Sequence, residues 1–86
     1  AVGSSDTSDH VKIEAIDWTA PSFGTPYDVC KVLAPVIDDL GIGQLIYEYP
    51  NGKSRAWVHT SRRKPSKAMN RVITITPNGT LLGIKP

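Results

Sequence analysis

Two histidines and two carboxylates are the residues of this chain best suited to chemistry. His10 precedes Asp17 by seven positions, and Glu48 and His59 fall in two consecutive predicted strands. Zinc accepts imidazole and carboxylate ligands, and a catalytic zinc site takes three protein ligands and keeps one position open. Two histidines and one carboxylate would complete that set, and the second carboxylate would serve as a general base. The same residues would also suit the polar ends of ordinary strands.

The length and composition of the chain limit the kind of protein and the kind of metal site it can form. The chain has 86 residues, enough for one small domain over residues 1–86. Its single cysteine, Cys30, excludes an internal disulfide and a cysteine-rich zinc site, and we expect it to be a structural thiol. No apolar run approaches the roughly 20 residues of a membrane span, and no leader peptide is visible. We therefore expect no membrane partner.

Positive charge is concentrated late in the chain. The net charge of +2 is too small to argue for nucleic acid, yet five of the ten cations lie within residues 62–71. The run has no interleaved aromatic residues of the kind on which single-stranded nucleic acid stacks. A solvated loop, a nucleic-acid patch and a contact with an anionic polymer all remain open for it.

The hydrophobic pattern predicts one helix and about five strands. Residues 1–9 are small and polar and indicate a loop or frayed terminus, and residues 11–18 favour a strand. A helix is predicted over residues 25–41, capped by Thr25, ended by Gly41, and kinked or split by Pro35. Strands are predicted over 43–50 and 55–61, followed by a hairpin over 71–84. This order indicates an α+β fold, with one helix packed on a mostly antiparallel sheet.

Alternation along the strands separates two faces of that sheet. Trp57 and His59 share one face of their strand, whereas Val58 and its even-numbered neighbours form the better core face. Glu48 shares a face with Gln44 and Ile46. His59 therefore suits a cleft better than a core.

Two blocks of this sequence resemble the M15 zinc peptidases. The stretch "SDHVKIEAID" resembles their Ser-x-His-x-x-Gly-x-Ala-x-Asp signature. The stretch "GQLIYEYPNGKSRAWVHTS" is similar to the Gln-Leu-Ile-x-Glu … Trp-Val-His segment of the phage-type branch, and Asn70-Arg71 fits its tail. The family includes D-alanyl-D-alanine carboxypeptidases and the L-alanyl-D-glutamate endopeptidases of phage lysins. The resemblance covers about residues 3–71.

The resemblance implies a cell-wall peptidase with a zinc cofactor. His10, Asp17 and His59 would be the Zn²⁺ ligands, and Glu48 the general base that takes a proton from the metal-activated water. The substrate would be a peptidoglycan stem peptide, cleaved in the periplasm or cell wall. A phage-encoded protein would stay in the cytoplasm before its release. The chain would act as a monomer, without nucleic acid. Residues expected to line the substrate site are Ser8, Trp57 and Arg62.

The sequence departs from the family pattern in two ways. Ile13 replaces the family glycine, although the chain must bend near residue 13 if His10 and Asp17 are to reach one metal. The sequence begins just before the motif, so we expect the upstream segment, which in the family supplies an arginine for the substrate carboxylate, to be missing from this chain. A catalytically inactive M15-like domain that binds cell wall or a protein partner therefore stays open. The other alternative is a small nucleic-acid-binding α+β module.

Overall fold

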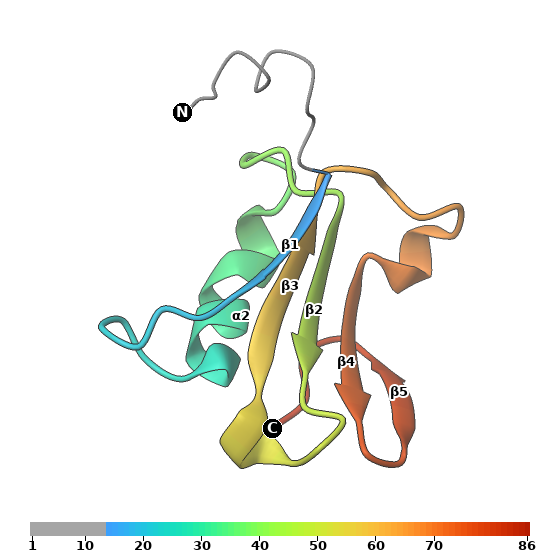
Figure 1. The fold of residues 1–86 in the computed structure, drawn as a ribbon. Helices are drawn as coiled ribbons and strands as arrows, with labels where there is room; N and C mark the ends of the chain where they lie inside the picture. The colour runs from blue at the N-terminus through green and yellow to red at the C-terminus, as the bar shows by residue number, and fades with distance from the viewer. Residues whose placement is uncertain (1–13) are drawn as a thin grey trace, which may run out of the picture.

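A five-stranded sheet forms one layer of the structure, and a helix covers one of its two faces (Figure 1). The computed structural model describes residues 14–86. The regular elements follow the predicted order of strand, helix and four strands, so the fold is of the α+β class that the sequence predicts. They are β1 (Ala15–Trp18), α2 (Pro26–Leu33), β2 (Gln44–Glu48), β3 (Trp57–Ser61), β4 (Val72–Thr76) and β5 (Gly79–Leu82). Three short 3-10 helices complete the set, namely η1 (Ala34–Val36), η2 (Lys53–Arg55) and η3 (Ala68–Asn70).

The strands do not lie in the sheet in the order of the chain. Their spatial order is β1-β3-β2-β4-β5, and all neighbours are antiparallel except β2 and β4. The first strand therefore pairs with β3, so that Asp17 lies directly opposite His59. The segment between β3 and β4 has to pass the end of β2, and it contains the cationic run of residues 62–71.

The helix begins as predicted but ends early. The Thr25 hydroxyl accepts a hydrogen bond from the Asp28 N–H, and the Asp28 carboxylate accepts one from the Thr25 N–H, which forms a capping box. Regular α-helix stops at Leu33, because Pro35 has no N–H to donate and its ring blocks the preceding turn. The chain continues as η1 and a turn that reaches Gly41 at φ 72°. The predicted split at Pro35 is thus confirmed, and the predicted helix over 25–41 is too long.

The strands are shorter than the sequence predicts. The segment before β3 is taken up by η2, so β3 starts at Trp57 and not at residue 55. In β1, regular pairing starts at Ala15, and residues 11–13 of the predicted strand lie outside the described residues. The predicted terminal hairpin is confirmed, with Pro77 and Asn78 in its turn and Gly79 paired with Thr76 at the start of β5.

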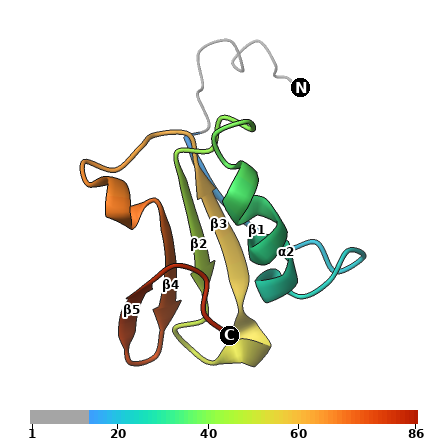
Figure 2. The same ribbon diagram turned by 180° about the vertical axis from the view of Figure 1, so that it is seen from behind.

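The hydrophobic core lies between the sheet and α2 (Figure 2). Leu45, Tyr47 and Val58 point from the sheet toward Val29 and Cys30 of the helix, and all five are buried. The prediction that Val58 marks the core face of β3 is therefore confirmed. Because alternate strand residues point to opposite faces, Trp57 and His59 must point away from α2.

The opposite face of the sheet is open. No element within residues 14–86 crosses the front of the sheet in Figure 1. The C-terminal residues pass over the helix side, where Thr74 donates to the Gly83 carbonyl and accepts from the Lys85 N–H. The open face therefore displays the side chains that the sequence analysis singles out. Within the described part of the chain, no helix has the length and apolar character that crossing a membrane requires.

Candidate metal centre

Asp17, Glu48 and His59 meet on the open face of the sheet. His59 lies on β3, between β1, which carries Asp17, and β2, which carries Glu48. The Nδ1 atom of His59 is 2.7 Å from Oδ1 of Asp17 and 3.8 Å from Oε1 of Glu48. One imidazole nitrogen thus faces two carboxylates that come from strands on either side of it.

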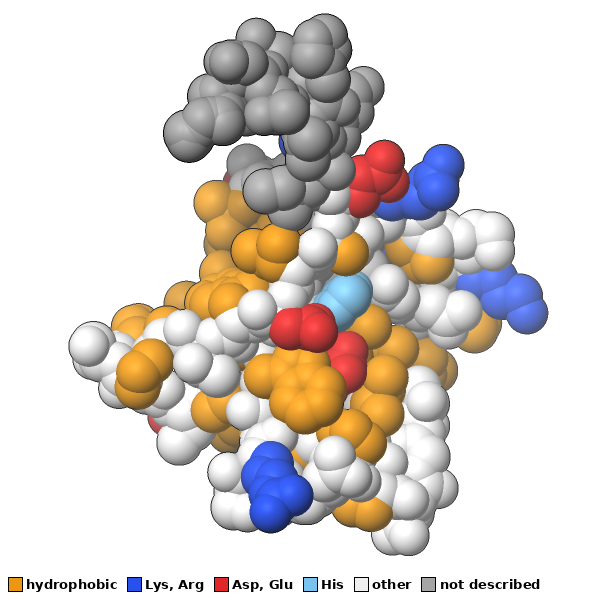
Figure 3. Space-filling view, in the orientation of Figure 1, with side chains coloured by type: hydrophobic (Ala, Val, Ile, Leu, Met, Phe, Trp, Pro, Cys, Tyr) orange, Lys and Arg blue, Asp and Glu red, His pale blue; other side chains and the backbone are white. Residues whose placement is uncertain are grey.

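The three side chains differ in their access to solvent. The exposed fraction of the side chain is 60% for Asp17, 23% for His59 and 16% for Glu48. Figure 3 shows the imidazole in pale blue beside red carboxylates, with hydrophobic side chains around and below them. The cluster is therefore open to solvent at Asp17 and screened from it at Glu48.

Glu48 is the member of the cluster whose pKa is shifted. Its pKa is raised above the ordinary value, first because burial disfavours the ionised form and second because the Asp17 carboxylate repels a further negative charge. His59 and the nearby Trp57 indole N–H act in the opposite direction. A carboxyl with a raised pKa suits a group that has to accept and release a proton near neutral pH.

The donor atoms of the cluster match the requirements of zinc. One imidazole nitrogen and two carboxylate oxygens all lie within 4.8 Å of one another. Ligands bonded at about 2.0 Å in a tetrahedral arrangement are about 3.3 Å apart, which lies between the two measured distances at His59. Placing a zinc ion between Asp17 and His59, whose atoms are 2.7 Å apart, would therefore need them to separate by about 0.6 Å.

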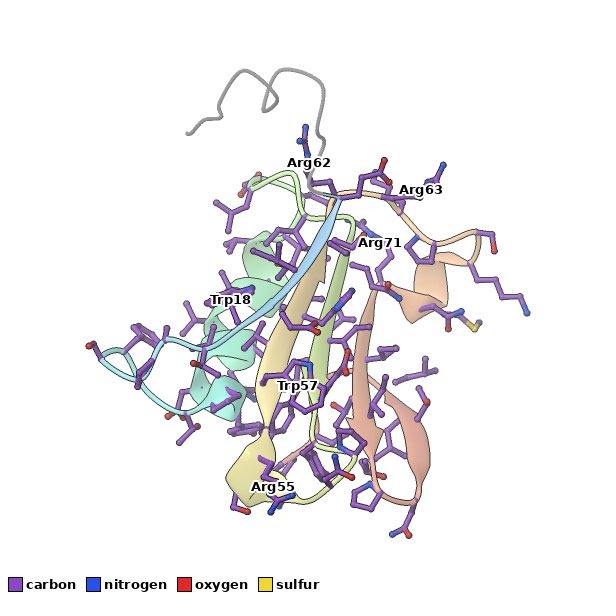
Figure 4. The ribbon with its side chains drawn as sticks, in the orientation of Figure 1. Trp18, Arg55, Trp57, Arg62, Arg63 and Arg71 are labelled. Carbon is purple, nitrogen blue, oxygen red and sulfur yellow. The ribbon has the colours of Figure 1, made fainter. Side chains whose placement is uncertain are left out.

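The structure brings together only part of the predicted site. His10, Ser8 and the bend expected near Ile13 lie outside the described residues. Trp57 lies on the open face beside the cluster, whereas Arg62 lies at the far end of the sheet, beyond β3 (Figure 4). The structure therefore offers no support for Arg62 as a substrate-binding residue.

Cys30 takes no part in the cluster. It is fully buried on the helix side of the sheet, and burial raises the pKa of its thiol to about 12. A thiol that stays protonated is a poor metal ligand. The expectation that Cys30 is structural agrees with this position.

The cationic run is in part a structural element. Arg71 donates from Nε to the Gly43 carbonyl and from Nη2 to the Ile42 carbonyl, each at 2.9 Å, and forms an ion pair with Asp38 at 2.8 Å. Within the run, Arg62, Arg63, Lys64 and Lys67 are exposed. One of the five cations thus holds the start of β4 against the turn before β2.

Two features of the site escape sequence reasoning. The pairing of β1 with β3 joins residues 42 positions apart, and no local pattern predicts it. The indole N–H of Trp57 is buried without a hydrogen-bond partner, although the residue type alone does not predict this.

Comparison of the chain with protein-family models, curated proteins and solved structures finds no match.

Proposed function

We propose that this chain is a zinc-dependent peptidase domain that hydrolyses a peptide bond in peptidoglycan stem peptides. The observation that supports the proposal is the convergence of Asp17, His59 and Glu48 on one face of the sheet. These are three of the four residues to which the resemblance gives metal-binding or base roles. They come from three strands, so their meeting does not follow from their proximity in the sequence.

Each residue of the cluster has a separate role in this proposal. Asp17 and His59 hold the metal together with His10, and Glu48 takes a proton from water and passes it to the leaving amine. When bound, zinc supplies Lewis acidity, which lowers the pKa of water and polarises a carbonyl. Glu48 suits the base role better than Asp17, because its carboxylate is more screened from solvent and its pKa is raised.

The open face suits a polymeric substrate. A stem peptide attached to a glycan strand cannot enter an enclosed cavity, and the cluster lies on a face that no described element covers (Figure 3). Trp57 lies on the same face and would give the peptide an apolar surface. The site of action would be the periplasm or cell wall, where this substrate occurs.

Hydrolysis of purified peptidoglycan tests the proposal. The zinc-loaded chain should release new amino termini, and a chelator should stop the release. Glu48→Gln should retain zinc and lose about 10²- to 10⁴-fold in rate, as expected for removal of a general base. A chain that binds zinc with no hydrolysis, while a known cell-wall peptidase cleaves the same preparation, would refute the activity and leave a metal-binding relative of such enzymes.

A further inference from the structure

An unpaired hydrogen-bond donor lies beside the cluster. The Nε1 atom of Trp57 is buried and has no hydrogen-bond partner. A buried N–H without a partner costs about 1–3 kcal/mol, so native proteins rarely retain one without a reason. The other tryptophan of the chain shows the ordinary arrangement, because Trp18 donates to the Thr60 hydroxyl at 3.0 Å.

A carboxylate lies opposite this donor. Trp57 and Glu48 are direct partners in the β2–β3 pairing, and opposite side chains of an antiparallel pair lie about 5 Å apart at Cβ. Within residues 14–86, the Glu48 carboxylate is 3.8 Å from His59, which is too far for a hydrogen bond, and a side-chain interaction with the Trp57 indole favours its ionised form. Because Nε1 is buried, an acceptor on the paired strand is the one we consider, and Glu48 is that residue.

We propose that the Trp57 indole N–H donates to the Glu48 carboxylate and so positions Glu48 for its task as the base. This inference rests on the proposed peptidase function for its purpose, although the hydrogen bond itself can be tested without any activity. Trp57 is then a positioning residue that acts through Glu48. The bond would leave the second carboxylate oxygen free to face the metal side of the cluster.

The two indole N–H groups of the chain can be observed separately by ¹H–¹⁵N correlation spectra of the full chain. In the zinc-loaded protein, the Trp57 indole proton should resonate downfield of its position in Glu48→Leu, which keeps the bulk and removes the acceptor. The Trp18 resonance serves as the internal control, because its partner Thr60 is unchanged. Identical Trp57 resonances in the parent and in Glu48→Leu, both with and without zinc, would overturn the proposal.

A kinetic comparison tests the purpose of the bond. Trp57→Phe keeps an aromatic ring and removes the N–H, so kcat should fall by about 10- to 100-fold, as for a lost hydrogen bond to a charged group, while KM and zinc content stay constant. A raised KM with an unchanged kcat would show that Trp57 contacts substrate, and would overturn the positioning role. If the parent shows no activity at all, the peptidase proposal fails, whereas the spectra still decide whether the hydrogen bond exists.

Discussion

Asp17 is the member of the cluster whose side chain can be removed with the least effect on folding. Its side chain is 60% exposed and makes a 2.7 Å hydrogen bond to His59. Pairs this open to solvent contribute about 0.2–1 kcal/mol. Asp17→Asn, which keeps the shape and removes the charge, should therefore lower the free energy of unfolding by less than about 1 kcal/mol.

The same substitution should have a much larger effect on zinc. Outer partners of a metal site change the affinity by about 10- to 100-fold, so the loss of a charged direct ligand should exceed 100-fold, or about 2.7 kcal/mol. The loss of zinc-binding free energy should thus exceed the loss of unfolding free energy by a factor of about three or more. Destabilisation of the fold alone cannot account for a loss of zinc binding this large.

Calorimetric titration with zinc, and urea denaturation of the same metal-free samples, would measure both quantities. Asp39→Asn is a matched control, because Asp39 is an exposed aspartate outside the cluster. It should leave the zinc affinity unchanged. Equal zinc affinity for Asp17→Asn and Asp39→Asn would refute the assignment of Asp17 as a ligand.

Three further predictions follow from individual side chains. Because the pKa of Glu48 is raised, its contribution to stability is complete below the unfolded pKa of about 4.3 and is lost as the pH rises through the folded pKa. Metal-free Glu48→Gln should therefore be more stable than the parent at pH 7 in urea denaturation, with the advantage absent at pH 3; a less stable variant at pH 7 would contradict this. Arg71→Met should lose about 1.5–3 kcal/mol in the same assay, since two backbone carbonyls lose a charged donor; an unchanged midpoint would contradict it. Cys30 should resist alkylation at pH 8 in the folded protein and react in urea, because it is fully buried and burial raises its pKa to about 12; rapid labelling of the folded protein would show that the thiol is accessible.

Local chemistry made much of the fold predictable. The capping residues at Thr25 and Asp28, the interruption at Pro35 and the turn of the terminal hairpin each act within a few positions of the chain. Strand alternation also predicts that Val58 faces the core and His59 faces away from it. These features depend on neighbours in the sequence, and the structure confirms them.

The order in which the strands pair could not be predicted from the sequence. The strand that contains Asp17 pairs with β3, and this long-range pairing brings Asp17 opposite His59. The parallel pairing of β2 with β4 likewise depends on the route of residues 62–71, which Arg71 anchors through contacts 28 and 29 positions away. The sequence therefore named the chemical groups of the site, and long-range pairing determines that three of them meet.

Metal analysis of the chain purified without chelator is the most direct test of the proposed metal centre. One zinc ion per chain is predicted for the parent protein, and a content near zero for His59→Ala, because His59 is the residue that both carboxylates of the cluster face. Circular dichroism would confirm that the variant is folded. A parent protein without zinc that also fails to bind added zinc, or a folded His59→Ala protein with a full complement of zinc, would contradict the assignment.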